Sequence, residues 1–409
     1  MATATHIIQW IAFVAGLALV LTTAKSVVNT VILPRSVSSR ITYRVWLVMH
    51  NTFMAVVRRM RRYESKDRLL AYASPITLIA ILVIWLLLFL VGYALMFWPL
   101  VHDFGLALRL SGSSIFTLGV YSSGLTGPIV LEYLAAATGL IVVALQIGYL
   151  PTIYGAYNRR ETLVSALTAR SGSPSWGPEI LARHQLSLAA ETLPALYTAW
   201  ETLAADIAET HTSYPWLIEM RSPNPLNSWI ISLLAVMDSA NLYITLSPGQ
   251  APASSRQCLR MGFVGLRAIA RVATITVNDD PRPDDPLQLT FEQFAFGVEH
   301  LRRVGFPVER TAEEAWPDFR GWRVNYEAVA YALADLILAV PAPWSGKRTH
   351  VSRAEAFDVL KNRPRHRTPS DPEGMRVRRL EAGESIVGET SPTAAVAPVA
   401  GVFAETDQA

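Results

Sequence analysis

Three long apolar segments in the first 160 residues of the chain predict three transmembrane helices. Residues 7–33 begin with the run IIQWIAFVAGLALVLTTA, residues 75–100 carry no charged side chain, and residues 129–154 form the third apolar stretch. Because a helix rises about 1.5 Å per residue, about 20 apolar residues cross a hydrocarbon core of roughly 30 Å. A cleaved signal peptide is the alternative for the first segment, but no Lys or Arg precedes the run and its apolar character continues past Lys25.

The connection between the second and third spans, residues 104–127, is the first candidate functional site. It includes all but the last residue of the stretch LSGSSIFTLGVYSSGLTGP (residues 110–128), which is rich in Gly and Ser and too short and broken to cross a bilayer. It therefore either rests at the outer surface or re-enters the membrane as a loop. Non-helical backbone is tolerated at membrane depth only where it is buried in protein or lines a water-filled cavity. A pore would be such a cavity.

The pattern changes after residue 160, where hydropathy falls and apolar residues follow a helical spacing. This predicts a cytosolic helical domain at residues 158–345. Residues 227–246 are nearly apolar enough to span a bilayer, but Asp238 lies in the middle, which favours a buried core helix. Residues 346–409 contain few large apolar side chains, so we expect a mostly disordered tail.

The prediction is therefore an all-α membrane protein with five parts. They are an N-terminal transmembrane helix (1–34), a basic linker (35–74), a two-helix pore-like module with a re-entrant loop (75–157), the cytosolic domain (158–345) and the tail (346–409).

Basic residues are concentrated at residues 35–68, and they recur in Arg159 and Arg160 after the third apolar segment. Because basic loops stay in the cytoplasm, this distribution places the N-terminus outside and the C-terminal domain inside. The centre of the linker, ITYRVWLVMHNTFMAVVRRMRR, combines apolar and basic side chains. Two interpretations are equally compatible with it: a helix lying on an anionic inner leaflet, or a short cytosolic helix packed on the rest of the protein.

Composition supports a membrane protein and offers little chemistry. Of the 409 residues, 51% are hydrophobic and only 17% are charged, which is more apolar than most soluble proteins. The single cysteine, Cys258, excludes an internal disulfide framework. Common nucleotide and metal motifs are absent, so we expect no enzyme activity, no cofactor and no nucleic-acid partner. His211 is predicted to be structural rather than catalytic, and the aspartates of residues 279–285 to form a solvated loop.

Two residues of the third apolar segment are further candidates. Glu132 is an ionisable group in its first turns, where either a role beside a pore or simple contact with the outer interface would make it tolerable. Gly139 lies mid-helix, at either a bend or a close packing contact between helices.

The loop also carries a partial filter motif. The triplet of Thr117, Leu118 and Gly119 resembles the start of a potassium-channel selectivity filter, and Val120 and Tyr121 follow it. Tyr121 stands where the second filter glycine belongs, and a serine stands where the filter aspartate belongs. Since a glycine at that place allows positive φ, we expect altered or lost potassium selectivity.

Other short matches follow in a fixed order: residues 30–35 (TVILPR), 131–132 (LE), 138–139 (TG), 147–151 (IGYLP), 159–161 (RRE) and 213–215 (SYP). Together they resemble a family of bacterial potassium-channel-like membrane proteins over residues 7–345. The resemblance implies a multi-pass inner-membrane protein with a two-helix pore module, an extra N-terminal helix and a cytosolic helical domain. It also implies monovalent cations as partners, beside the lipid bilayer.

Two functions from different classes remain open at this stage. A channel would need a homotetramer, because each chain supplies only one pore loop. The alternative is a non-conducting membrane receptor or scaffold that acts through its cytosolic helical domain.

Overall fold

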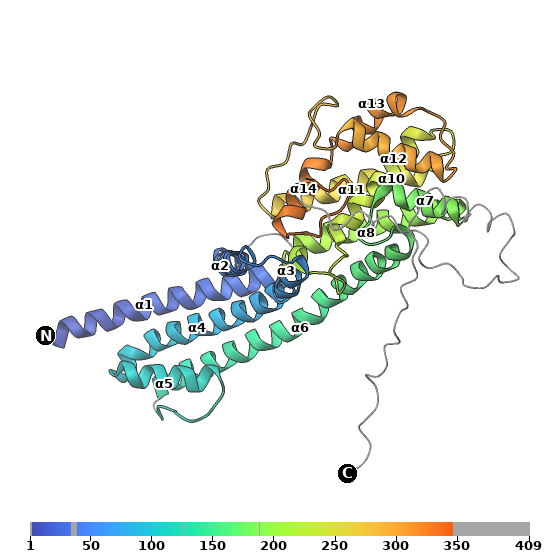
Figure 1. Cartoon of the computed structure of the whole chain (residues 1–409). Coiled ribbons are helices and arrows are strands. Elements are labelled where there is room, and N and C mark those ends of the chain that lie inside the picture. Colours follow the sequence, from blue (N-terminus) through green and yellow to red (C-terminus); the bar gives the residue numbers. More distant parts are fainter. Residues whose placement is uncertain (1, 34–38, 125, 188, 347–409) are drawn as a thin grey trace, which may run out of the picture. The chain divides into compact units, whose positions relative to one another are not determined.

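The computed structural model describes residues 2–33, 39–124, 126–187 and 189–346, and within these ranges every regular element is helical (Figure 1). The predicted all-α class is therefore confirmed for the described residues. The predicted tail, apart from residue 346, lies outside them. The first six α-helices are α1 (Ala2–Val27), α2 (Arg40–Val57), α3 (Tyr63–Leu70), α4 (Ala73–Val101), α5 (Phe104–Ile115) and α6 (Thr126–Ser171).

Four helical segments are long and apolar enough to cross a membrane: Thr5–Ile32, Tyr63–Val101, Pro128–Ser171 and Trp229–Leu246. In the first three, only 22%, 39% and 22% of the most apolar window is buried inside the protein, whereas the fourth is 100% buried. Apolar surface that no protein covers is stable in lipid, so the first three segments indicate a protein embedded in a membrane. They correspond to the three spans expected from the hydropathy pattern.

The helices α1 and α4 approach each other closely at two glycines. A Cβ atom added to Gly16 would lie 2.5 Å from the Gly92 carbonyl oxygen, and one added to Gly92 would lie 2.8 Å from a methyl group of Val20. Small residues at such a crossing let two backbones approach and pack by van der Waals contact, which is the usual basis of helix association in lipid.

The helix α2 runs across the ends of α1 and α4 (Figure 1). A buried hydroxyl cluster fixes it there: Thr42 lies 2.9 Å from the Thr30 hydroxyl, and Ser39 donates to Ser26 at 2.6 Å. Trp85 of α4 also donates to Ser26, at 3.0 Å. The opposite side of α2 leaves apolar side chains exposed, among them Leu47, Val48 and Val56. The helix thus packs on the protein, as one of the two interpretations of its sequence expected, and it also presents an apolar surface. The contact with an inner leaflet stays a prediction.

The remaining helices form the second half of the described chain. They are α7 (Gly177–Leu186), α8 (Leu193–Ser213), α9 (Trp216–Glu219), α10 (Trp229–Leu246), α11 (Ala253–Val272), α12 (Phe291–Arg303), α13 (Ala312–Arg323) and α14 (Glu327–Leu336). The helix α10 contacts α6, α7, α8, α11, α13 and α14, and all of its residues are buried. It is the buried core helix that we expected from Asp238 in its middle. Its apolar side chains pack inside this domain.

The long helix α6 belongs to both halves of the protein. It extends over 46 residues, or about 69 Å, and therefore exceeds the bilayer core by more than a factor of two. The predicted domain boundary between residues 157 and 158 falls inside this helix. The two units expected from the sequence are therefore joined by continuous helix rather than by a linker.

Candidate functional site

The structure places a short helix, α5, in the first half of the predicted re-entrant loop. His102 has a φ of +59° and ends α4, and Asp103 then accepts a hydrogen bond from the Gly105 amide at 2.8 Å. An Asp at this position satisfies an otherwise unpaired amide of the first helical turn. These two residues reverse the chain, so that α5 lies against both α4 and α6 (Figure 1). The sequence prediction did not include this helix.

The C-terminal end of α5 meets α6 at Gly139. A Cβ atom added there would lie closer than 3.0 Å to the Ile115 carbonyl oxygen, a separation that real Cβ atoms essentially never show. Of the two roles considered for Gly139, the structure shows the close packing contact. Gly139 lies 13 residues after the first residue of α6, which corresponds to about 20 Å along the helix axis. The C-terminal end of α5 therefore lies far from the N-terminal end of α6. The loop that connects these two ends must cover this distance.

The loop after α5 contains the five candidate filter residues and is held by one serine. The Ser113 hydroxyl donates to the Tyr121 carbonyl at 3.0 Å and accepts from the Tyr121 amide at 3.0 Å. Thr117 and Gly119 have positive φ values of +51° and +67°. The backbone of Tyr121 is outside this left-handed region, so its side chain causes no strain of that kind here.

Side chains of the candidate filter point away from the protein, while its backbone is partly free. Leu118 and Val120 are 63% and 68% exposed. The Arg109 guanidinium lies 5.6 Å from the centre of the Tyr121 ring, within the range of a cation–π contact. The carbonyls of residues 117–120 accept no hydrogen bond from any residue that the structure describes. These oxygens are available to another group.

Glu132 fastens the end of the same loop to α6. Its carboxylate accepts a hydrogen bond from the Ser122 hydroxyl at 3.0 Å and one from the Ser123 amide at 2.8 Å, and the residue is only 9% exposed. These contacts bring Glu132 to the candidate loop, in keeping with a role beside it. Sequence reasoning did not identify Ser113, whose only signal was its place in a Ser-rich stretch.

Removal of the Glu132 carboxylate should loosen the loop locally. In Glu132→Ala, the Ser123 amide loses its acceptor, and a hydrogen bond to a charged group contributes about 1.5–3 kcal/mol. We expect its hydrogen exchange, followed by mass spectrometry of the loop peptide, to accelerate by about ten-fold or more. Ser122→Ala, which removes the other bond alone, should have a smaller effect at Ser123. Equal exchange in Glu132→Ala and the wild type would contradict the fastening role.

Comparisons with protein-family models, curated proteins and solved structures find no match. The site therefore has to be interpreted from its own geometry. No group of three or more His, Cys, Asp or Glu side chains in the described ranges could hold a metal ion.

The C-terminal part of α6 is tied to the helical domain by a buried arginine. Arg160 donates to the Leu217 carbonyl at 2.7 Å, to the Met220 carbonyl at 2.7 Å and to Glu161 at 2.8 Å. It also lies 2.9 Å from Nε2 of His211, and both Arg160 and His211 are fully buried. His211 thus lies in a structural network, where the sequence led us to expect it. The network holds α6 rigidly against the segment around α9.

Two of the buried histidines of the domain, His184 and His211, should make its stability fall in acid. Burial, and then the charge of Arg160, lower the pKa of His211 well below its ordinary value of 6.5. Burial also lowers the pKa of His184. Below about pH 6.5 the unfolded chain binds protons that the folded chain does not, so stability is lost as the pH falls. A histidine that stays neutral in the folded chain over this range costs about 1.4 kcal/mol between pH 7.5 and 5.5, so His211 should contribute about this much and His184 less.

Thermal melting of the purified protein at the two pH values measures this effect. Because Gln cannot bind the proton, His211→Gln should show a smaller drop in melting temperature between pH 7.5 and 5.5 than the wild type. If the variant and the wild type lose the same amount, His211 does not contribute to the acid sensitivity.

Proposed function

We propose that this chain is one subunit of an oligomeric cation pathway in a bacterial inner membrane. Its pore module would consist of α4, α5, the loop at residues 116–124 and the first half of α6. The observation that supports this most is the contact of Ile115 with Gly139, about 20 Å from the start of a helix that is long and apolar enough to span. In a core of roughly 30 Å, this contact supports a loop whose irregular backbone lies at membrane depth, where it would require protein or water around it.

The charge distribution of the loop favours cations. The C-terminal end of α5 carries the partial negative charge of a helix dipole and leads directly into the loop. The carbonyls of residues 117–120, which accept no hydrogen bond from a described residue, add oxygen ligands of the kind that replace an ion's hydration shell. Only part of a filter would result, because the Tyr121 carbonyl accepts from Ser113. We therefore propose weak selectivity among monovalent cations, with no enzymatic step and no cofactor.

A single chain leaves the loop uncovered on one side, as the exposed side chains of Leu118 and Val120 show. The polar backbone of this loop would need further protein or water around it at membrane depth. Symmetric packing of four copies would surround one axis with four loops, which is the assembly we propose. The N-terminus would then be outside and the helical domain in the cytoplasm, following the basic excess of residues 35–68.

Ion flux through the purified protein in liposomes tests the proposal, with potassium, sodium and chloride compared at equal gradients. We expect passage of both cations with modest preference, exclusion of chloride, and a tetrameric mass in detergent. Phe116→Cys, at an exposed position beside the unpaired carbonyls, should make flux sensitive to thiol reagents. Exposed Val264 on α11 supplies the control, Val264→Cys, which should not. A stable monomer that passes no ion would overturn the proposal.

A non-conducting receptor or scaffold is the second candidate, and the bonds of Tyr121 favour it. Because Ser113 binds both backbone groups of Tyr121, this half of the loop is fixed by the protein itself and needs no ion for its order. In that case the tie between α6 and the domain would carry a signal, and liposomes would show no flux although the protein is folded.

A further inference from the structure

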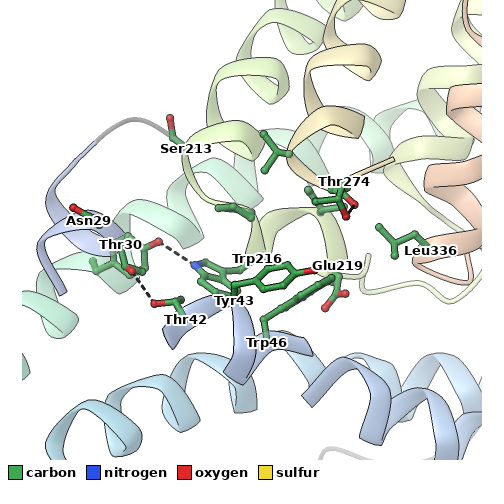
Figure 2. A pocket seen from close by; sticks show the side chains of 15 residues that line it. Asn29, Thr30, Thr42, Tyr43, Trp46, Ser213, Trp216, Glu219, Thr274 and Leu336 are labelled. Atoms are coloured by element: carbon green, nitrogen blue, oxygen red, sulfur yellow. Dashed lines mark hydrogen bonds between the residues drawn. The ribbon is translucent and has the colours of Figure 1, made fainter. Parts of the chain in front are cut away.

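A cavity of about 110 Å³ lies where the spanning helices meet the helical domain (Figure 2). Its walls come from the last turn of the α1 segment, α2, α6, the segment of residues 213–219, the end of α11 and α14. The last turn of the α1 segment (Val28–Ile32) is a π-helix, a local widening that is often found at functional sites. A molecule bound in this cavity would contact both halves of the protein at once.

Aromatic rings form much of the cavity wall. Tyr43 and Trp46 of α2 stack obliquely, with their ring centres 5.7 Å apart. Trp216 lies in the same wall and donates to the Tyr149 hydroxyl at 3.1 Å, which fixes both rings. Figure 2 shows Tyr43 and Trp46 beside Glu219. Because aromatic faces carry partial negative charge, such a wall attracts positively charged groups.

Glu219 is the one charged residue among the described residues that line the cavity. Its Oε1 accepts a hydrogen bond from Nδ1 of His50 at 2.7 Å, while its Oε2 has no hydrogen bond to any described residue. The side chain is only 11% exposed. A half-paired carboxylate in a mostly apolar cavity disfavours an anionic occupant and is stabilised by a cationic one.

We propose that this cavity binds a small organic cation of the alkylammonium class, with its charged head at Glu219 and its alkyl groups against the aromatic wall. The volume excludes large ligands, and the lining matches the recognition of quaternary ammonium groups by aromatic rings. The site is separate from the loop at residues 116–124 and does not depend on whether the protein conducts ions. Occupancy would brace α2 against α9 and the end of α11.

Titration calorimetry of the full-length protein in maltoside detergent tests the site, with choline as the probe. Its uncharged carbon analogue, 3,3-dimethylbutan-1-ol, has the same shape and should bind at least ten-fold more weakly. Glu219→Gln keeps an acceptor for His50 but removes the charge, so it should weaken choline binding at least ten-fold. Glu209→Gln, at an exposed position of α8, should bind choline like the wild type.

Three results would overturn the proposal: no saturable binding of choline, equal binding of the uncharged analogue, or unchanged binding by Glu219→Gln. If that variant does not fold, Tyr43→Leu replaces it and should also lose affinity, since Tyr43 is 40% exposed and is not required for the core. Nanodiscs separate the two sources of an alkylammonium group. If phosphatidylcholine nanodiscs compete with choline and phosphatidylglycerol nanodiscs do not, the occupant is a lipid headgroup. If choline binds equally in both kinds of nanodisc, the occupant is a soluble cation.

Discussion

Gly139→Ala should lower the stability of the protein and abolish or strongly reduce any ion flux. The new methyl group would collide with the Ile115 carbonyl oxygen, so the end of α5 would have to move away from α6. Overpacking of this kind costs about 1–3 kcal/mol. The effect on flux should be larger than the effect on stability, because the loop that follows α5 depends on this contact for its position.

Gly148→Ala is the matched control. Gly148 belongs to the same helix, and an added Cβ would have nothing within 4 Å. Alanine favours a helix over glycine by about 1 kcal/mol, so this variant should be as stable as the wild type or slightly more so. Melting temperature in detergent and flux in liposomes give the two readouts. Identical behaviour of Gly139→Ala and Gly148→Ala would show that α5 does not rest on Gly139.

Asp238→Ala should have the largest effect on the helical domain. Arg323 is completely buried and pairs with Asp238, and it also donates to Glu327 at 2.6 Å. Tyr326 donates to the same Asp238 oxygen at 2.8 Å. Loss of this carboxylate leaves part of a buried positive charge uncompensated, which costs about 3–5 kcal/mol. We expect the domain to melt well below the wild type or to fail to fold.

An exposed ion pair of the same domain serves as the comparison. Arg303 and Glu299 on α12 are 3.0 Å apart, with half of each side chain in solvent. Because water screens such a pair, Glu299→Ala should cost no more than about 1 kcal/mol. Circular dichroism melts of both variants measure these two losses of stability. A small loss for Asp238→Ala would mean that the domain tolerates Arg323 without this partner.

Hydropathy was sufficient to predict the segments that are apolar enough to span, because this apolar character is contained in the sequence of each segment. It also separated α10 from them, since Asp238 in mid-helix needs a buried partner. Arg323 supplies that partner from 85 residues further along the chain, and no local pattern identifies it.

The interior of the candidate site was less predictable, because its contacts also follow no local sequence pattern. The second half of α5 is rich in Gly and Ser, which form helices less readily than Ala does. It becomes helical through its cap at Asp103 and its packing against α4 and α6. The hold of Ser113 on Tyr121 depends on how the loop folds back after the helix. The sequence alone shows that Tyr121 stands where the second filter glycine belongs. It does not show the φ value of Tyr121.

The uninterrupted course of α6 has a mechanical consequence. Gly139, where α5 rests, and Arg160, which the domain grips, are 21 residues apart on one helix, a distance of about 30 Å. Pro151 lies between them and removes one backbone hydrogen bond of the helix. The remaining hydrogen bonds still resist stretching and twisting more than a loop does, so the helix acts as a lever with Pro151 as its weakest point. A small tilt imposed at Arg160 would therefore arrive at Gly139 as a sideways displacement of the surface that supports the loop. The two halves of the described chain are thus connected by helix rather than by a flexible linker.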